Sequence, residues 1–147
     1  MNKKNIVTAL KNFFKENASL FNIDMAFLYG SWARGYPRKD SDVDIALVFL
    51  AKSSNENITF KILTDISFEL SMKVKKEVNI ISISWDFVKP LVSYNAIVLG
   101  LPLYIKDFER YVALKNYAIV QMEDFRLFGL KWQLEIAERN LEVLRYA

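Results

Sequence analysis

The last quarter of the chain constrains its fold most. Residues 108–146 contain no proline and a single glycine, Gly129, so they are expected to be helical throughout. An unbroken helix of this length would extend for about 60 Å, whereas a compact domain of 147 residues has a radius of gyration of about 15 Å. The sequence therefore predicts that this helix either breaks, with Gly129 as the weakest point, or projects from the body.

Apolar residues follow two faces of this helix. The first face contains Leu114, Ala118, Met122, Phe125, Trp132 and Ile136. The second contains Val120, Leu127, Leu130, Leu134, Leu141 and Leu144. A helix that is apolar on two faces needs two neighbours. One is the domain itself, and two explanations are open for the second: the core of the same domain or another chain.

The chain has no cysteine and no histidine. This excludes disulfide scaffolds, thiol nucleophiles, Cys/His zinc sites and Ser-His-Asp triads. Any metal would need oxygen ligands, and any general base would be Asp, Glu, Lys or Tyr. With 52% hydrophobic residues and only four glycines and three prolines, the chain is expected to form one globular core.

Charge and hydropathy also limit the partners. The net charge of +3 is too small to favour nucleic acid as a ligand. The longest apolar run, residues 96–105, is shorter than the roughly 18–20 residues that a membrane span requires. Residues 1–10 lack the apolar stretch of a signal peptide. We therefore expect a cytoplasmic protein that acts on neither membranes nor nucleic acids.

Hydrophobic periodicity predicts a mixed α/β or α+β domain over residues 1–106, followed by a helical segment over residues 107–147. Strands are expected at residues 25–29, 43–50, 77–83 and 101–105. Helices are expected at residues 3–17, 58–74 and 85–99, and a polar loop at residues 51–57. The strand at residues 43–50 is almost entirely aliphatic, which indicates burial on both faces.

The chemistry is concentrated in residues 27–50. A strand leads into Gly30 and Ser31, where a tight turn and the start of a short helix can bring backbone N–H groups to a phosphate. Asp42 and Asp44 then stand two residues apart at the next strand, so both carboxylates point to one face and can bind a divalent cation together. Without a cation, keeping both carboxylates ionised would cost free energy, because like charges repel and burial removes their water.

This pattern resembles that of the DNA polymerase beta-like nucleotidyltransferase superfamily, in which Gly-Ser is followed by an Asp-x-Asp pair on the next strand. Arg34-Gly35 and Ser41 resemble the small prokaryotic minimal nucleotidyltransferase (MNT) group. The resemblance implies a small mixed β-sheet flanked by helices. It also implies an antitoxin that transfers AMP from ATP to a tyrosine of a partner HEPN toxin.

The resemblance assigns roles to individual residues. Gly30 and Ser31 would hold the triphosphate, and Asp42 and Asp44 would bind Mg²⁺. Arg34 flanks the turn and is a further candidate for nucleotide binding, as are Arg38 and Lys39. For adenine stacking the candidates are Trp32 and Tyr36, although a core position suits Trp32 better.

The superfamily also has a third catalytic carboxylate on a later strand, and the aligned residue here is Asn79. An amide oxygen can bind a metal but cannot accept a proton. Glu77 lies on the same face, about 6.6 Å along the strand. Three outcomes are open: Glu77 substitutes through local geometry, catalysis is slow, or the protein binds nucleotide with little transfer.

The leading hypothesis is an adenylylating antitoxin that forms a hetero-oligomer with a HEPN toxin. One alternative is a weak or inactive nucleotidyltransferase module that masks the toxin through its C-terminal helix. Another is an enzyme that modifies a small molecule such as an aminoglycoside. Tyr117 and Asp124 of the C-terminal helix could face a partner, and exposure to solvent explains them equally well.

Overall fold

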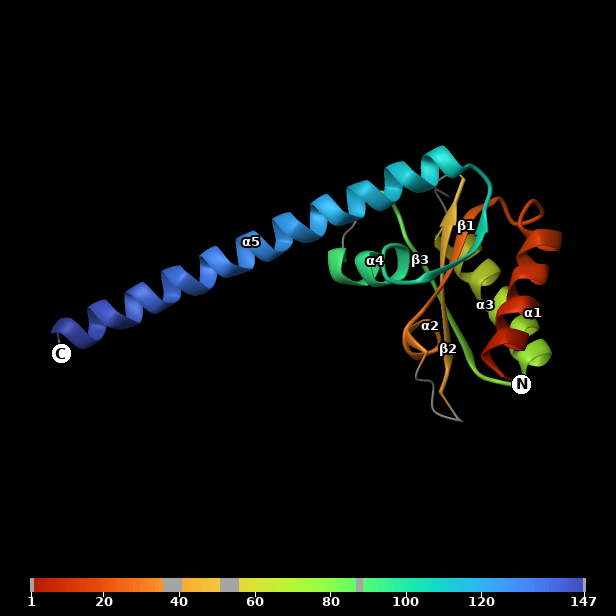
Figure 1. Ribbon diagram of the computed structural model, residues 1–147, viewed down its shortest axis with the longest axis horizontal. Helices are drawn as coiled ribbons and strands as arrows, with labels where there is room; N and C mark the ends of the chain where they lie inside the picture. Colours follow the sequence, from red (N-terminus) through yellow and green to blue (C-terminus); the bar gives the residue numbers. More distant parts are fainter. Residues whose placement is uncertain (1, 36–40, 51–55, 87–88, 147) are drawn as a thin grey trace.

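The computed structural model describes residues 2–35, 41–50, 56–86 and 89–146, which form a four-stranded sheet and five helices (Figure 1). The strands are β1 (Ile23–Tyr29), β2 (Val43–Phe49), β3 (Val78–Ser82) and β4 (Leu101–Ile105). The helices are α1 (Lys3–Asn17), α2 (Ser31–Arg34), α3 (Glu56–Val74), α4 (Pro90–Ile97) and α5 (Phe108–Tyr146). The sheet order is β3-β2-β1-β4. Only the β2–β3 pair is parallel, so the predicted mixed sheet and α/β class are confirmed.

Helices α1 and α3 cover one face of the sheet (Figure 1). The side chain of Asn2 caps α1 by accepting a hydrogen bond from the Asn5 backbone N–H at 2.9 Å. Apolar residues spaced by three and four along α1 then pack against alternate residues of β2, including Ile45 and Leu47. This layer forms the larger core. Its buried members from α1 and α3 are Ile6, Leu10, Phe13, Phe14, Ile66, Leu70 and Val74.

The other face of the sheet packs against α4 and the first turns of α5 (Figure 1). Leu114 and Ala118 of α5 are buried there with Ala96 and Ile97 of α4. The strands contribute Met25, Phe27, Ala46 and Val48. Strand β2 is therefore buried on both faces, as its aliphatic sequence predicts.

An ion pair fastens the start of α5 to β1. The guanidinium of Arg110 donates to both carboxylate oxygens of Asp24, at 2.8 and 3.0 Å, and Asp24 is only 3% exposed. Arg110 also donates to Asp107 at 3.0 Å. The hydrogen bonds to Asp24, and then the negative charges of Asp24 and Asp107, raise the pKa of Arg110 above its ordinary value. The burial of Asp24 on β1 is thus compensated by a bidentate partner on α5.

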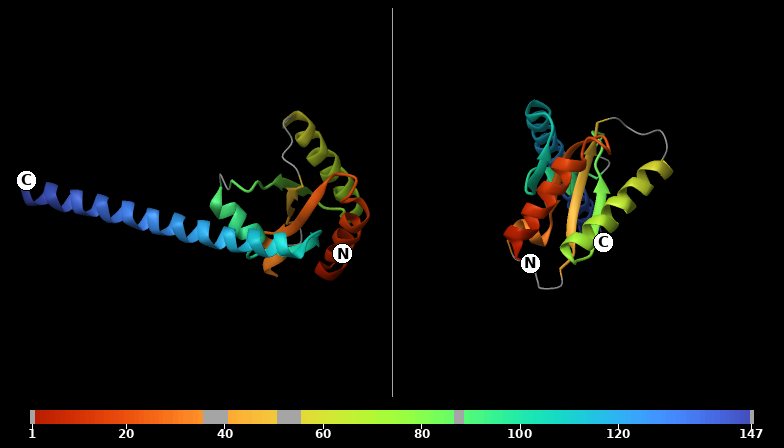
Figure 2. Two further views of the ribbon diagram at one scale, coloured as in Figure 1. Left: turned by 90° about the horizontal axis from the view of Figure 1, so that it is seen from above. Right: turned by 90° about the vertical axis from the view of Figure 1, so that its right-hand side faces the viewer.

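Helix α5 is continuous for 39 residues and extends away from the body (Figure 2). The predicted break at Gly129 is therefore wrong, and the predicted alternative, projection from the domain, is confirmed. A glycine inside a helix costs only about 1 kcal/mol relative to alanine, and the good helix formers on both sides of Gly129 outweigh this cost. The outer half of α5 leaves many apolar side chains exposed.

The other predicted elements are found, the strands with bounds within two residues of those expected and two of the helices with different starts. Helix α3 begins at Glu56, inside the predicted polar loop. The helix expected over residues 85–99 is wrong at its start, because Trp85 and Asp86 lie in a turn and α4 begins at Pro90. Proline suits the first turn of a helix and disfavours helical backbone in the residue before it. Within the described ranges, no helix is both apolar enough and long enough to span a bilayer.

Candidate active site

Asp42 and Asp44 lie where β2 begins, on the sheet face that α4 and α5 cover further along. Val43 and Ile45 alternate with them and are buried in the opposite core, so the expected separation of carboxylates and aliphatic side chains is present. Asp42 is exposed and Asp44 is half-buried. Burial raises the pKa of Asp44 and the nearby Asp42 raises it further, while a hydrogen bond from Asn79 lowers it. The ionised pair is therefore a site of unfavourable negative charge.

Asn79 completes this cluster from β3. It is paired in register with Asp44 across the parallel strands. Its amide nitrogen donates to an oxygen of Asp42 at 3.3 Å and to an oxygen of Asp44 at 3.4 Å. A rotation of the amide would turn its oxygen toward the same point, where it could bind a cation as a neutral ligand.

Gly30 makes room for the carboxylates. Its φ of +75° lies in the region that side chains rarely adopt, and a Cβ at this position would lie 2.6 Å from Oδ2 of Asp44. Any other residue would push into the carboxylate oxygen that a cation would bind. The turn after β1 therefore requires glycine for both its backbone conformation and its space.

The rest of the turn is arranged around a core tryptophan. Ser31 is the first residue of α2 and is half-buried, and Arg34 is its exposed last residue. Trp32 is 4% exposed, and its indole N–H donates to the backbone oxygen of Ser41 at 3.1 Å. Trp32 therefore holds the turn against the start of β2, as the core interpretation predicts, and is too buried to stack on adenine.

Glu77 is not brought into the cluster. It is exposed and precedes β3, and its backbone oxygen accepts a hydrogen bond from Val43 at 2.9 Å. Across the part of the chain that the structure describes, no third carboxylate joins Asp42 and Asp44. The site thus consists of two carboxylates and one amide.

Tyr29 is a neighbour of the site that the sequence analysis did not single out. It pairs in register with Asp44 across the antiparallel strands. Burial raises the pKa of its phenol, and the negative charge of Asp44 raises it further. Tyr29 also lines a cavity of about 340 Å³ between the sheet and α4, together with Ile81, Ser82, Ile83, Ser84, Lys89, Val92 and Ser93. Its alternation with Phe27 on β1 was the available sequence signal.

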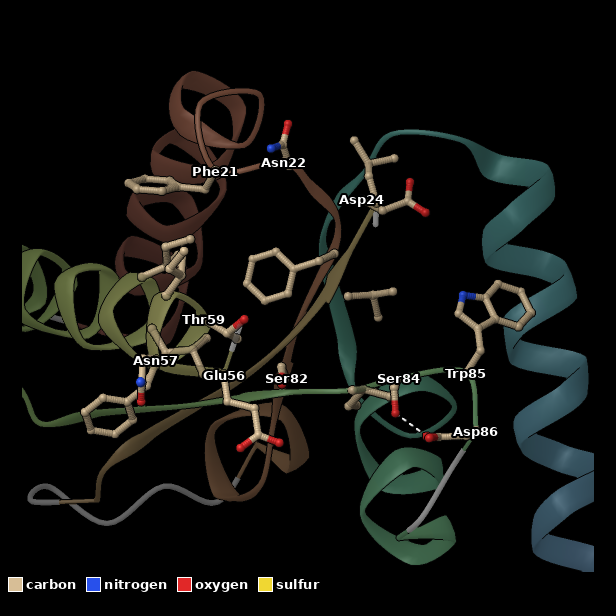
Figure 3. Close-up of a pocket in the computed structure, with 18 of the residues that line it drawn as sticks. Phe21, Asn22, Asp24, Glu56, Asn57, Thr59, Ser82, Ser84, Trp85 and Asp86 are labelled. Atoms are coloured by element: carbon tan, nitrogen blue, oxygen red, sulfur yellow. Dashed lines mark hydrogen bonds between the residues drawn. The ribbon is translucent and has the colours of Figure 1, made fainter. Parts of the chain in front are cut away.

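A larger cavity of about 1220 Å³ lies at the opposite end of β2 (Figure 3). Its wall includes Val48 and Phe49 of β2 and Leu50 directly after this strand. Trp85 and Asp86, which follow β3, also line it, and Asp86 accepts a hydrogen bond from Ser84. None of the predicted site residues lines it. The candidate active site is therefore the cluster at the start of β2.

The cluster fits a magnesium ion. Its donors are the oxygen ligands that Mg²⁺ prefers, and two carboxylates are the usual protein contribution when substrate phosphates supply the remaining ligands. The absence of a side chain at Gly30 lets the carboxylate of Asp44 lie directly against the turn. Asp42, Asp44 and Asn79 are accordingly the residues that would hold the ion.

The remaining candidate residues are on α5 or outside the described residues. Tyr117 stacks on Trp85 with ring centroids 6.3 Å apart, so one face of the Tyr117 ring packs against another residue of the same chain. Asp124 is exposed on α5. Tyr36, Arg38 and Lys39 lie outside the described residues.

Comparison with known proteins places this site in a family. The sequence profile described as Polymerase beta, Nucleotidyltransferase matches residues 8–109. No curated protein matches the chain.

Several solved structures share the fold. A chain of a toxin-antitoxin crystallised with AMP-PNP has a TM-score of 0.60 and 15% identity, over 94% of this chain and 98% of that one. A chain of the toxin-antitoxin MntA-HepT has a TM-score of 0.62 and 11% identity, over 88% and 97%. A chain from the complex of the tri-AMPylated Shewanella oneidensis HEPN toxin with its MNT antitoxin has a TM-score of 0.59 and 12% identity, over 93% and 98%. These matches show the nucleotidyltransferase fold, and the family profile covers more than half of the chain. The chain therefore belongs to the polymerase beta nucleotidyltransferase family.

Proposed function

We propose that this protein is an antitoxin that transfers AMP from ATP, with Mg²⁺, to a tyrosine of a partner HEPN toxin. The observation that carries the proposal is the convergence of Asp42 and Asp44 beside Gly30, on the scaffold of a nucleotidyltransferase. Chains of the same fold occur in a toxin-antitoxin with AMP-PNP and in a complex with a tri-AMPylated HEPN toxin. Those two structures support ATP as the donor and a HEPN toxin as the acceptor.

Each residue of the cluster has a defined task in this proposal. The turn at Gly30 and Ser31 holds the triphosphate, and Arg34, exposed at the end of α2, is in place to reach a phosphate. Asp42 and Asp44 hold Mg²⁺, which when bound neutralises phosphate charge and polarises the reacting phosphoryl group. Asn79 supplies a neutral oxygen or keeps the two carboxylates in place through its amide nitrogen.

In the transfer itself, the tyrosine oxygen forms a bond to the α-phosphorus of ATP while the bond to pyrophosphate breaks. The hydroxyl proton passes to water, because the amide of Asn79 cannot accept it and no further carboxylate of the described chain adjoins the pair. A positioned base typically accelerates such a step by about 10²–10⁴-fold. The proposed enzyme therefore depends on positioning and charge neutralisation and is slow compared with a relative that has a third carboxylate.

The partner complex is a hetero-oligomer in this proposal. The face of α5 that packs on the domain through Leu114 and Ala118 continues outward along Phe125, Trp132 and Ile136. A toxin bound to this outer portion would sit on the same side of α5 as α4 and the sheet face that contains Asp44. Docking there would deliver an acceptor side chain toward the site.

The test incubates the purified protein with ATP, Mg²⁺ and the HEPN toxin proposed as its partner, and then measures the intact mass of that toxin. We expect an increase of one or more AMP units with the wild type and none with Asp44→Asn. Asp65→Asn, which makes the same chemical change at an exposed position of α3 on the other side of the sheet, serves as the matched control and should retain transfer. An unmodified partner in the wild-type reaction would refute the transfer.

A second candidate function, masking of the toxin without transfer, is favoured by Asn79 at the position opposite Asp44 and by the apolar faces of α5. It predicts a tight complex and loss of toxicity with no added mass. In that case Asp44→Asn would neutralise the toxin as well as the wild type does. The same reactions, followed by a toxicity measurement, therefore distinguish the two functions.

A further inference from the structure

A row of leucines on the outer half of α5 has no partner within the described chain. Its members, which we call the leucine face, are Leu127, Leu130, Leu134, Ala137, Leu141 and Leu144. The five leucines are 53–72% exposed. Their spacing alternates strictly between three and four residues, which is the a/d pattern of a coiled coil.

The leucine face lies on the side of α5 away from the domain. With 3.6 residues per turn, positions 114 and 118 fall on nearly the opposite side of the helix from positions 130, 134 and 141. Leu114 and Ala118 are the α5 residues buried against the sheet and α4. The leucine face is thus separate from the outer face that the proposed function assigns to the toxin, and the body does not obstruct a helix bound to it.

We propose that the leucine face binds the same face of a second copy of this chain, as an antiparallel two-helix coiled coil. In such a pair, each a residue meets a d residue of the partner helix. One register uses every member of the row: Leu127 meets Leu144, Leu130 meets Leu141, and Leu134 meets Ala137. Each contact occurs twice because the two copies are related by a two-fold axis.

The charges beside the leucine face select this antiparallel orientation. Lys131 and Glu138 flank the row on one side, and in the antiparallel register Lys131 of each copy lies nearest Glu138 of the other. The other side carries Arg126, Gln133 and Asn140, of which Gln133 and Asn140 are neutral and lie nearest one another. In a parallel pair, Lys131 would instead face Arg126 of the other copy, which places two positive charges together. The flanking charges are therefore self-complementary in only one direction.

The length of α5 also suits a second copy. In this register the end of each helix reaches the region of residue 124 of its partner, and α5 is exposed on this side from Ile119 outward. The overlap is therefore confined to the projecting half. A partner of unrelated sequence would need to match both the leucine spacing and the charge order, whereas a second copy matches them by symmetry.

The test measures the self-association of the full-length protein without toxin, by sedimentation equilibrium. We expect a reversible dimer in the wild type. Lys131→Glu places an acidic side chain next to Glu138 of the other copy, at two equivalent places in the dimer. It should therefore weaken the dimer by about tenfold or more. Lys131→Glu combined with Glu138→Lys should restore the dimer. A parallel dimer would instead become tighter with Lys131→Glu alone, which would overturn the proposal.

A second pair of variants tests the face itself. Leu134 and Trp132 are both 57% exposed and lie on opposite sides of α5. Leu134→Gln should abolish the dimer, and Trp132→Gln should leave it intact, with circular dichroism confirming that both variants retain their helix. A wild type that stays monomeric at high micromolar concentration, or a dimer lost with Trp132→Gln and kept with Leu134→Gln, would overturn the proposal. None of these outcomes depends on nucleotidyl transfer, so this inference and the proposed function can fail separately.

Discussion

Asn79 lies directly opposite Asp44 in the parallel pairing of β2 and β3, and its amide nitrogen donates to Asp44 at 3.4 Å. A neutral side chain therefore stands where a third carboxylate would adjoin the pair. Without a cation, the Asn79 amide reduces the repulsion between Asp42 and Asp44 by donating to both. The same residue deprives the site of a proton acceptor.

Replacing Asn79 with Asp should increase the repulsion among the carboxylates and should give the site a proton acceptor. We expect Asn79→Asp to lower the melting temperature in the absence of Mg²⁺, because three carboxylates would then converge. With Mg²⁺, ATP and the toxin, the rate of AMP transfer should rise by about tenfold or more, since the new carboxylate can accept the hydroxyl proton. Asn79→Ala removes the hydrogen bonds without adding a base and should give no such gain. An unchanged rate in Asn79→Asp would show that proton transfer does not limit the reaction.

The two glycines at the ends of α2 provide a matched pair of variants. Gly30 and Gly35 both have positive φ angles, of +75° and +87°. Gly35 is in the left-handed region (ψ 8°), where alanine should cost roughly 1–2 kcal/mol, whereas Gly30 has a ψ of −151°, a conformation that is essentially restricted to glycine and should cost roughly 1–3 kcal/mol. Only at Gly30 would the new Cβ also meet Asp44, at 2.6 Å, whereas at Gly35 the nearest atom among the described residues is Nζ of Lys3 at 4.0 Å.

We therefore expect Gly30→Ala to abolish Mg²⁺-dependent ATP binding in titration calorimetry, and Gly35→Ala to keep it. Both variants should unfold at lower temperature than the wild type. Equal ATP affinity in the two variants would mean that the space beside Asp44 is not where the metal and phosphates bind.

The raised pKa of Asp44 predicts how stability changes with pH. Its folded-state pKa lies above the ordinary value of 3.8, first because of burial and then because of Asp42. Above the folded-state pKa the carboxylate is ionised at a cost that the unfolded chain avoids, so Asp44 destabilises the fold at neutral pH. This penalty decreases as the pH falls through the raised pKa and is absent below about 3.8.

Without Mg²⁺, Asp44→Asn should therefore melt at a higher temperature than the wild type at pH 7, and the difference should disappear toward pH 3.8. Adding Mg²⁺ with ATP should stabilise the wild type and leave the variant unchanged. Scanning calorimetry across this pH range provides the measurement. A variant less stable than the wild type at pH 7 without Mg²⁺ would contradict the assigned sign.

In the ion pair between Asp24 and Arg110, loss of the arginine should destabilise the fold more than loss of the aspartate charge. Arg110→Ala leaves the carboxylate of Asp24 buried without its bidentate donor, whereas Asp24→Asn leaves a guanidinium that is 43% exposed and still bonded to Asp107. We expect a larger decrease in melting temperature for Arg110→Ala than for Asp24→Asn. Asp107→Asn, at the exposed side of the same cluster, should have the smallest effect. The reverse order would show that the pair does not fasten α5 to β1.

Much of this architecture follows from local patterns in the sequence. The aliphatic run after Asp42 predicts a strand buried on both faces, and the two-residue spacing of Asp42 and Asp44 predicts a shared direction; both are found. The start of α4 was predicted wrongly because the periodicity carries the helix across Lys89, whereas the backbone of Lys89 (φ −122°, ψ 82°) is not helical, in keeping with the restriction that proline places on the residue before it.

The remaining features depend on contacts between distant segments. The position of Tyr29 beside Asp44 follows from the register between β1 and β2, which cannot be read from either strand alone. Whether α5 would break or project depended on the balance between the cost of Gly129 and the helix-forming residues around it. Likewise, β3 begins at Val78, after Glu77, and Asn79 is the residue that pairs with Asp44, a register that the residue types of neither strand reveal.

Since α5 is unbroken at Gly129, the direction in which each face of its outer half points is fixed relative to the body. Because each residue turns the helix by about 100°, inserting two residues after Gly129 would turn the leucine face by about 200°, to the side that faces the sheet. Inserting seven would nearly restore its direction and lengthen the arm by about 10 Å. The length of the helix and the direction of its faces can thus be changed separately. A single rigid arm sets not only how far its outer surfaces lie from Asp44 but also the direction in which each of them faces.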